Sequence, residues 1–446
     1  MRRLLIGCTA LSLAFWAVGV AGAGIASSAE VASAAGGSSV RSDFDGDGFG
    51  DLAVGVPSEN TARGAVNVIY GSAGGLTASD QYWTQDSPGI KGTAEDLEGF
   101  GDALAAGDFD GDGFGDLAVG VPGESSDADP ESARGAVNVL YGSSHGLTAA
   151  GNQLWSQDSP GINGTSEGYD AFGSVLAAAN FGKSAHADLA IGVPGENNYR
   201  GAVSVIYGSA GGLTAAGDRY WSQDSTGIKG TAEYADYFGF ALAAANFGKS
   251  AHADLAIGAP EENNHRGAVN VIYGSAGGLT AAGDQYWTQD SPGIKGLAEG
   301  GDSFGSVLAA ANFGKSAQAD LAIGMPWENN NRGAVNVIYG SSGGLTAVGD
   351  QYWTQDSPGI KGVGSSAFGF ALGVANFGKS AQADLAVGVP GAGISNRGAV
   401  NVIYGSAGGL TASGDQYWTQ DSPGIKGTAE PGDSFGEVLD GHNAML

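Results

Sequence analysis

Cysteine is almost absent from this sequence of 446 residues, which contains only Cys8. Because we expect Cys8 to be removed with an N-terminal leader, structural disulfides are excluded, and an exported chain then has to be stabilised by packing or by bound metal. Basic residues are also scarce: 19 Lys and Arg stand against 47 Asp and Glu, a formal net charge of −28. This charge excludes nucleic acid as a partner and attracts divalent cations.

Long apolar runs are missing beyond the first residues. The N-terminus carries Arg2 and Arg3, then an apolar stretch rich in Leu and Ala, then small residues before Glu30. This order predicts a secretory signal peptide at 1–29, followed by a linker at 30–42. An uncleaved membrane anchor is the alternative, although Gly and Ala make the segment only weakly apolar. We therefore expect a secreted, extracellular monomer that has no contact with the membrane after cleavage.

A helical period long enough to join parallel strands is also missing, and a repeated unit takes its place. "DLAVGVP" or a variant begins at six positions: Asp51, Asp116, Asp188, Asp254, Asp320 and Asp384. Each copy is followed by a form of "RGAVNVIYG", then of "QYWTQDSPGIKG", then by "FGxxL". The four segments of a unit predict four short strands joined by Gly-rich turns as antiparallel hairpins.

A sheet that is apolar on both faces needs a neighbouring sheet on each side. Six such sheets packed radially supply these neighbours, so the predicted fold is all-β: a six-bladed β-propeller of four-stranded antiparallel blades over 43–446. An open stack of sheets is the alternative. The chain begins without an "FGxxL" strand and ends with one, which predicts that 435–439 pair with the strand at 51–56 and close the ring.

The order of "FGxxL", an acidic loop and "VGVP" resembles the FG-GAP repeats of the integrin α-subunit propeller and of bacterial secreted integrin-like proteins. The resemblance covers about 43–446. It implies a calcium-binding, adhesion-type recognition module, although integrin propellers have seven blades and their stalk and membrane helix have no counterpart here. The same repeats occur in a glycan-anchor-cleaving phospholipase D, whose separate catalytic domain is also without a counterpart.

The first two units carry acidic loops whose carboxylates alternate with Gly and Phe. Like charges this close repel one another unless a cation lies between them, and carboxylate oxygens suit Ca²⁺. We therefore predict two calcium sites, with a solvated acidic turn as the alternative. The resemblance implies the same ligands, with main-chain carbonyls of Phe49 and Phe114 added. The predicted carboxylate ligands are Asp43, Asp45, Asp47, Asp51, Asp108, Asp110, Asp112 and Asp116.

The other four loops lose three carboxylates and gain a lysine: Lys183, Lys249, Lys315 or Lys379. We predict that the ammonium replaces the ion by bridging the retained Asp and nearby carbonyls; a lysine that points into water is the alternative. His186 and His252 lie in two of these loops, where we expect surface polar residues and no metal ligands.

Hairpin geometry places the acidic loops and the "GSAGGLT" turns on one rim, and the "VPxEN" turns and "GIKGTAE" connections on the other. On this second rim, a Glu four residues before an Arg predicts a brace in four units: Glu59/Arg63, Glu196/Arg200, Glu262/Arg266 and Glu328/Arg332. The same rim gathers side chains that vary between copies and suit recognition of a protein or glycan, unless they reflect neutral drift. These are Tyr169, Tyr199, Tyr234, Tyr237, His265 and Trp327.

A unique catalytic constellation is missing. The five His residues show no metal-ligand spacing, and the "GSAGG" segments recur without the strand-to-helix context of a nucleophile elbow. A binding module is therefore favoured over an enzyme. An extracellular hydrolase related to the propeller-bearing phospholipase D proteins is one alternative, and a purely structural scaffold is another.

Overall fold

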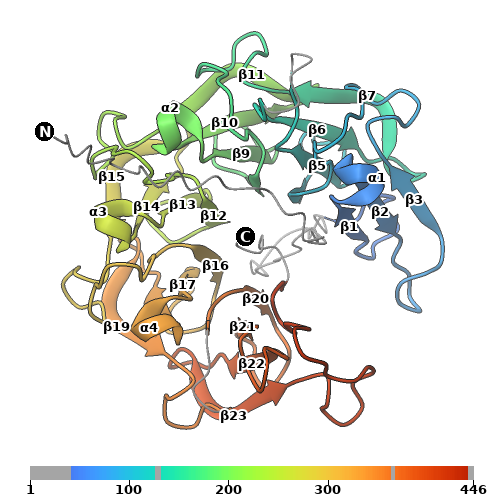
Figure 1. Ribbon diagram of the computed structural model, residues 1–446. Coiled ribbons are helices and arrows are strands. Elements are labelled where there is room, and N and C mark those ends of the chain that lie inside the picture. Colours follow the sequence, from blue (N-terminus) through green and yellow to red (C-terminus); the bar gives the residue numbers. More distant parts are fainter. Residues whose placement is uncertain (1–41, 126–131, 363–366, 440–446) are drawn as a thin grey trace, which may run out of the picture.

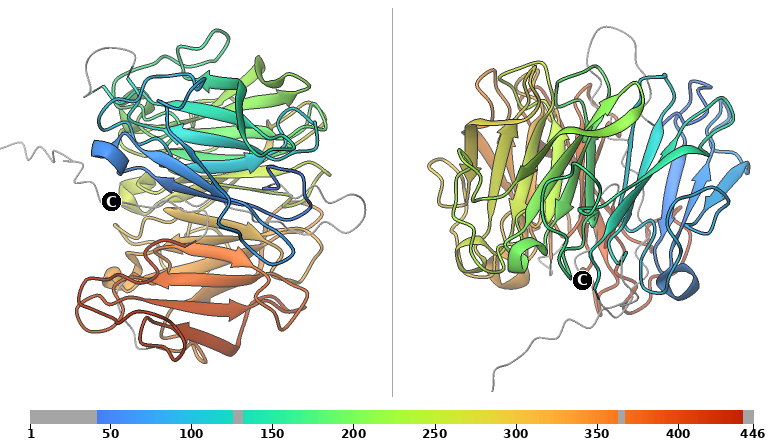
Figure 2. Two further views of the ribbon diagram at one scale, coloured as in Figure 1. Left: turned by 90° about the vertical axis from the view of Figure 1, so that its right-hand side faces the viewer. Right: turned by 90° about the horizontal axis from the view of Figure 1, so that it is seen from above.

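The structure is a computed structural model that describes residues 42–125, 132–362 and 367–439. These residues form six antiparallel sheets arranged around a common centre (Figure 1). Figure 2 shows the strands running between two rims of loops. The predicted signal peptide and all of the linker except Ser42 lie outside the described residues. Within the described ranges, no helix has the length and apolar character to cross a bilayer.

The first three sheets follow one another along the chain, and the first of them has three strands where the others have four. The strands of the first sheet are β1 (Leu52–Val56), β2 (Ala65–Ile69) and β3 (Asp80–Trp83). Those of the second and third sheets are β4 (Leu104–Gly107), β5 (Asp116–Val121), β6 (Ala136–Tyr141), β7 (Thr148–Trp155), β8 (Val175–Ala179), β9 (Asp188–Val193), β10 (Ala202–Ser209) and β11 (Gly212–Trp221).

The last three sheets repeat the four-stranded pattern in the same order. Their strands are β12 (Ala241–Ala245), β13 (Asp254–Ala259), β14 (Ala268–Tyr273), β15 (Thr280–Trp287), β16 (Val307–Ala311), β17 (Asp320–Met325), β18 (Ala334–Tyr339), β19 (Thr346–Trp353), β20 (Leu372–Ala375), β21 (Asp384–Val389), β22 (Ala399–Tyr404) and β23 (Thr411–Trp418). Six all-β sheets confirm the predicted fold class at this level.

The fourth strand of a sheet is longer than the sequence predicts. In the fourth sheet, β15 begins at Thr280, which pairs with Tyr273, and the register then shifts before Gln285 pairs with Val271. Gly283, with φ +81°, lies in this irregular stretch. Glycine there permits a bulge that keeps the strand paired on both sides, whereas in sequence alone the Gly is typical of a turn.

Four short helical turns lie on the rim opposite the acidic loops: α1 (Glu59–Ala62), α2 (Glu196–Tyr199), α3 (Glu262–His265) and α4 (Glu328–Asn331). Their backbones are left-handed after the first residue; in α2, Asn197 and Asn198 have φ of 52° and 61°. Asparagine tolerates this region better than most residues, which accounts for the Asn-rich sequence of these turns.

The core lies between neighbouring sheets. Five apolar clusters join the first sheet to the second, and so on to the sixth. A phenylalanine from each of the first five loops fills one of these junctions: Phe44, Phe109, Phe181, Phe247 and Phe313 are all fully buried. The first five "FGxxL" phenylalanines are buried as well, and Phe172, for example, bridges back to Gly135 of the preceding sheet.

A tyrosine hydroxyl links each sheet to the next. Tyr207 Oη accepts the N–H of Leu279 at 3.1 Å, and Tyr273 Oη accepts that of Leu345 at 3.2 Å. Tyr273 Oη also donates to Gln285, whose Nε2 donates to the carbonyl of Leu345 at 2.9 Å. Each junction therefore combines apolar burial with hydrogen bonds that fix its register.

The sixth junction, between β20–β23 and β1–β3, is not formed by the described residues. β1 pairs only with β2, and Phe435 and Leu439 pack on the sixth sheet. Phe377 is 51 % exposed and Leu76 is 55 % exposed, whereas their counterparts at the other junctions are buried. The predicted pairing of 435–439 with β1 is thus not observed among these residues, and ring closure stays a prediction.

Candidate metal centre and rim

The first acidic loop brings three carboxylates together. Oxygens of Asp43, Asp45 and Asp51 lie within 4.8 Å of one another. The loop turns tightly because Asp43 accepts the N–H groups of Asp47 at 3.1 Å and Gly48 at 2.9 Å. Asp47, the fourth predicted ligand, accepts the N–H of Phe49 at 2.8 Å and is not among the clustered groups.

The second acidic loop clusters a different set of three. Oxygens of Asp108, Asp110 and Asp112 lie within 4.8 Å of one another, and Asp108 accepts the N–H of Gly111 at 2.6 Å. Asp116 lies outside this cluster, with its two oxygens taken by the N–H groups of Phe109 at 2.6 Å and Gly142 at 2.9 Å. The coordinating roles of the Phe49 and Phe114 carbonyls stay predictions.

The carboxyl groups of these loops lie close to one another, and the last Asp of each loop is buried. Burial raises the pKa of Asp51 to about 6 and that of Asp116 to about 8, and neighbouring carboxylates in each loop add to the rise. Three hard oxygen ligands gathered within one short loop are the donor set that Ca²⁺ prefers. The residues present therefore fit a divalent cation in each loop.

The last Asp of the loop has one role in all six units. In the third loop, Asp188 accepts the N–H of Phe181 at 2.8 Å through one oxygen and that of Gly208 at 2.9 Å through the other. The equivalent pair of bonds is made by Asp51, Asp116, Asp254, Asp320 and Asp384. This Asp is retained in the Lys-bearing loops because it closes the loop itself.

The Lys-bearing loops replace the lost carboxylates with internal hydrogen bonds. In the third loop, Asn180 accepts the N–H of Gly182 at 2.9 Å and donates to the carbonyl of Ser184 at 3.0 Å. The Lys183 ammonium donates to the carbonyl of Gly217 at 2.5 Å and lies 3.5 Å from the centre of the Tyr207 ring. These contacts hold the turn with the lysine ammonium in place of a metal ion.

The prediction for the lysines is therefore half right. The ammonium binds a carbonyl, as expected, and the same contacts recur for Lys249, Lys315 and Lys379. Among the described residues it forms no ion pair with the retained Asp, whose two oxygens are occupied by backbone N–H groups. The Tyr ring as the partner of the ammonium was not foreseen from the sequence.

Successive loops also contact one another. A Cβ on Gly46 would lie 2.5 Å from Cε1 of Phe114, and a Cβ on Gly111 would lie 2.4 Å from Cδ2 of His186. The expectation that His186 is a surface residue is therefore wrong in part, because its ring is half-buried against the second acidic loop. Glycine at these positions is required both by the positive φ and by this close approach.

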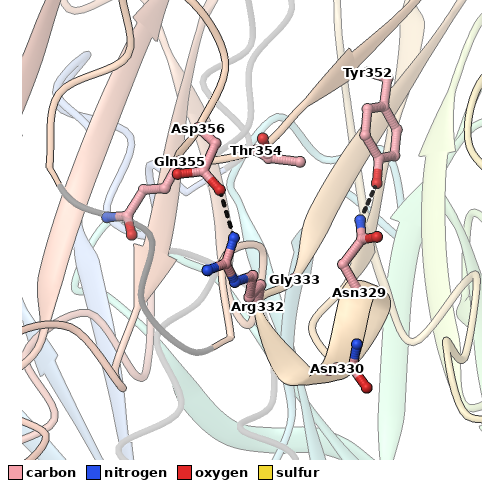
Figure 3. A pocket seen from close by; sticks show the side chains of 8 residues that line it. All are labelled: Asn329, Asn330, Arg332, Gly333, Tyr352, Thr354, Gln355 and Asp356. Carbon is pink, nitrogen blue, oxygen red and sulfur yellow. Dashed lines mark hydrogen bonds and ion pairs between the residues drawn. The ribbon is translucent and has the colours of Figure 1, made fainter.

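On the opposite rim, the predicted Glu–Arg brace is wrong. Arg332 pairs with Asp356 of its own sheet at 2.8 Å, Arg266 with Asp290 at 3.7 Å, and Arg63 with Asp96 at 2.8 Å. These pairs are exposed, so solvent screens them and they contribute little to stability. The Arg–Asp pair of the fifth sheet lines a pocket of about 430 Å³, beside Tyr352 and Asn329, which are also hydrogen-bonded to each other (Figure 3).

The glutamates instead join neighbouring sheets. Glu262 of the fourth sheet accepts Nε2 of Gln223 from the third sheet at 2.5 Å and the hydroxyl of Tyr286 at 3.1 Å. Gln157 donates in the same way to Glu196, and Gln289 to Glu328 at 2.8 Å. A hydrogen bond to a buried carboxylate contributes more than the exposed pair that the sequence predicted.

A second carboxyl group lies against the glutamate at four junctions. The pairs are Glu98–Glu124, Asp170–Glu196, Asp236–Glu262 and Asp302–Glu328. The last two pairs share a side-chain hydrogen bond, which requires a proton. Burial, followed by repulsion within the pair, raises the pKa of Asp236 to about 7, and burial raises that of Glu328 to about 7. At the fifth junction both acids are replaced in the sequence, by Ser366 and Ala392.

The structure places the predicted rim residues in separate groups. Tyr199, Tyr234 and Tyr237 lie together, with ring centres of Tyr199 and Tyr237 5.5 Å apart. Trp327 packs on Phe370 at 6.2 Å, and His265 is paired with Glu261. Tyr169 is 53 % exposed and belongs to none of the described ring pairs.

Comparison with known proteins agrees with this arrangement. Residues 35–69 and 100–139 match the family model for the FG-GAP repeat. The chain is 35 % identical over 172 residues to phosphatidylinositol-glycan-specific phospholipase D of Bos taurus, covering 37 % of this chain and 19 % of that protein. It is 30 % identical over 220 residues to integrin alpha-8 of Mus musculus, covering 49 % of this chain and 19 % of that protein.

The chain therefore contains FG-GAP repeats, at residues 35–69 and 100–139. It is homologous to integrin α subunits and to the glycan-specific phospholipases D, which confirms the resemblance seen in the sequence. It spans about a fifth of the length of these relatives.

We predict that the carboxyl pairs make stability fall as the pH rises. Their folded pKa of about 7 lies above the ordinary values of 3.8 for Asp and 4.5 for Glu, so the folded state holds the extra proton. This contribution is complete below pH 4 and is lost as the pH rises through about 7. Thermal unfolding in saturating CaCl₂ between pH 5 and 8 measures it.

The matched variant carries Asp302→Asn and Glu328→Gln, which keep the shape of one pair without its titration. Its melting temperature should fall less between pH 5 and 8 than that of the wild type. An equal fall in both proteins would contradict the assignment.

Proposed function

We propose that this protein is a secreted, calcium-stabilised β-propeller that serves as an extracellular recognition module of the adhesion type. The proposal rests on one observation: the loops at the two ends of the strands form two rims of different chemical character. Acidic loops suited to a cation lie on one rim, and exposed aromatic side chains on strained turns lie on the other. Binding residues on loops held by a rigid sheet scaffold are typical of recognition proteins.

Calcium would be held by Asp43, Asp45 and Asp51 in the first loop, and by Asp108, Asp110 and Asp112 in the second. The ion would neutralise carboxylates that otherwise repel one another and fix each loop against its neighbour, since Phe114 of the second loop covers Gly46 of the first. Asp47 and Asp116, together with the Phe49 and Phe114 carbonyls, are the further ligands that the sequence predicts.

Ring closure belongs to the same proposal. Leu76 and Tyr404 are the two residues that would form the sixth Tyr–Leu hydrogen bond, because every other Tyr of this position accepts the N–H of the corresponding Leu in the next sheet. Phe377 and the partly exposed face of β1 are apolar and would cover each other. Closure would also give Gln420 and Glu59 the contact made by the other Gln–Glu pairs.

An extracellular hydrolase is the second candidate, favoured by the homology to the phospholipases D. In the ranges that the structure describes, the two acidic loops are the groups of three or more acidic, His or Cys side chains arranged for a metal. Both belong to the repeats, so the binding module has the better support from the side chains of this chain.

The calcium prediction is tested by titration of the full chain after chelation. Isothermal titration calorimetry should show two Ca²⁺ ions bound, because only two loops keep the carboxylate cluster. A variant with Asp45→Asn and Asp110→Asn should lose both, while Asn180→Asp in a Lys-bearing loop should add none. Binding of four or more ions, or of none, would contradict the site assignment.

The closure prediction is tested with two phenylalanines at equivalent positions. Phe313→Ala removes a fully buried ring and should cost about 3–5 kcal/mol in the free energy of unfolding. If the sixth junction forms in solution, Phe377→Ala should cost nearly as much. A cost of about 0.5 kcal/mol, as expected for a surface position, would show that the junction stays open.

Recognition is tested by a screen of cell-surface proteins and glycans, with the full chain immobilised through its acidic-loop rim. A specific ligand should bind in CaCl₂ and be weakened by chelator, because the loops support the frame. Turnover of phosphodiester or polysaccharide substrates without a retained ligand would favour the hydrolase instead.

A further inference from the structure

The rim opposite the acidic loops carries a repeated pair of left-handed residues. One member ends the turn after the second strand of a sheet, and the other precedes the "FG" of the following connection. The N–H of the second donates to the carbonyl of the first, at 2.9 Å between Tyr237 and Tyr199. Every member has φ between +30° and +69°. The six pairs are Ala62/Gly99, Ala133/Ala171, Tyr199/Tyr237, His265/Ser303, Asn331/Ala367 and Asn396/Ser434.

The left-handed region is costly for bulky side chains, and most of the pairs respect this. Gly, Ala, Ser and Asn fill nine of the twelve positions, and His fills one. The pair between the third and fourth sheets is different, because it places two tyrosines there, with φ of 60° and 54°. Folding does not require them, since the other pairs make the same backbone bond with small residues. Strain of this kind that the fold does not need is typical of a functional site.

The two rings form a cluster with a third tyrosine. Tyr199 and Tyr237 are half-buried, with ring centres 5.5 Å apart and planes inclined by 45°. Tyr234 stands at 6.4 Å from Tyr199 with an interplanar angle of 89°, and it is 73 % exposed. Phe240 makes an edge contact with Tyr237, with ring centres 6.4 Å apart. The three tyrosine rings therefore form an aromatic surface in which the Tyr234 ring stands nearly perpendicular to that of Tyr199, and Phe240 packs on Tyr237.

Exposed polar residues flank the tyrosines in the sequence. Asn198 of the same left-handed turn and Glu233 of the connection are both exposed next to the tyrosines in the sequence. A pyranose ring has an apolar C–H face that packs on an aromatic ring, and hydroxyl groups at its edge that need hydrogen-bond partners. Tyr hydroxyls, an amide and a carboxylate supply these partners, whereas a protein hot spot requires a desolvated apolar pocket around its aromatic residues.

We propose that Tyr199, Tyr234 and Tyr237 form a saccharide-binding site. This proposal rests on the proposed recognition function and specifies the ligand as a neutral oligosaccharide. One sugar ring would pack between the rings of Tyr199 and Tyr234, and Asn198 and Glu233 would lie at its edge.

The test is calorimetry of the full chain in CaCl₂ with three soluble probes: cellopentaose, chitopentaose and mannopentaose. The wild type should bind at least one of them. A variant with Tyr199→Ala and Tyr237→Gly should bind it at least about tenfold more weakly, which is the scale of one lost aromatic contact. The matched control, Asn331→Ala with Ala367→Gly, changes the same two positions at the junction between the fifth and sixth sheets and should alter binding by less than about twofold.

Thermal unfolding separates binding from folding. Because Tyr237→Gly relieves a strained residue and Gly99 fills the same position in the first unit, the tyrosine variant should melt no lower than the control. Failure of the wild type to bind any of the three probes, or equal binding by both variants, would overturn the saccharide assignment. A protein ligand captured in the screen of surface molecules would then leave the recognition function standing, whereas no ligand of either kind would remove both.

Discussion

One carboxylate per unit holds this protein together. The last Asp of each loop accepts two backbone N–H groups, for Asp188 one from Phe181 of its own loop and one from Gly208 of the following strand, β10. A hydrogen bond to a charged acceptor contributes about 1.5–3 kcal/mol, so each pair is a large term in a marginally stable fold. The bond also orients the preceding Phe, which is the residue that fills the space between neighbouring sheets. Loop, sheet and junction thus depend on the same side chain.

The acidic loops and the Lys-bearing loops stabilise the turn before this Asp in two different ways. In the first two units, further carboxylates cluster at the backbone turn, and a bound cation would neutralise their charge. In the other four, an Asn makes the turn and a lysine packs its ammonium on a Tyr ring and a carbonyl. Because the retained Asp makes the same two bonds in both, the chain has lost metal ligands in four units without losing the fold.

Much of the architecture follows from the sequence because the unit recurs six times. The repeats define four strands, their order and the rims, and the apolar faces of "DLAVGV" and "AVNVIY" imply sheets on both sides. The sequence does not predict contacts between units: Gln223 with Glu262, Tyr207 with Leu279, and the carboxyl pairs all join residues whose meeting depends on how sheets pack. The Glu–Arg brace was predicted wrongly for this reason. The spacing of four residues suggested that Glu and Arg pair locally, whereas the glutamate accepts a hydrogen bond from a Gln of the neighbouring sheet. The sequence singled out Tyr199, Tyr234 and Tyr237 among six rim residues that vary between copies, but their clustering and the left-handed backbone of Tyr199 and Tyr237 are visible only in the structure.

The central claim, that the loop-closing Asp acts without metal, is tested most directly by Asp254→Asn in a Lys-bearing loop. An amide keeps the size of the side chain but leaves one N–H group without its acceptor. The free energy of unfolding should fall by about 2–4 kcal/mol, by the same amount in CaCl₂ and in chelator. A loss that appears only in CaCl₂, or a loss below about 0.5 kcal/mol, would contradict the account.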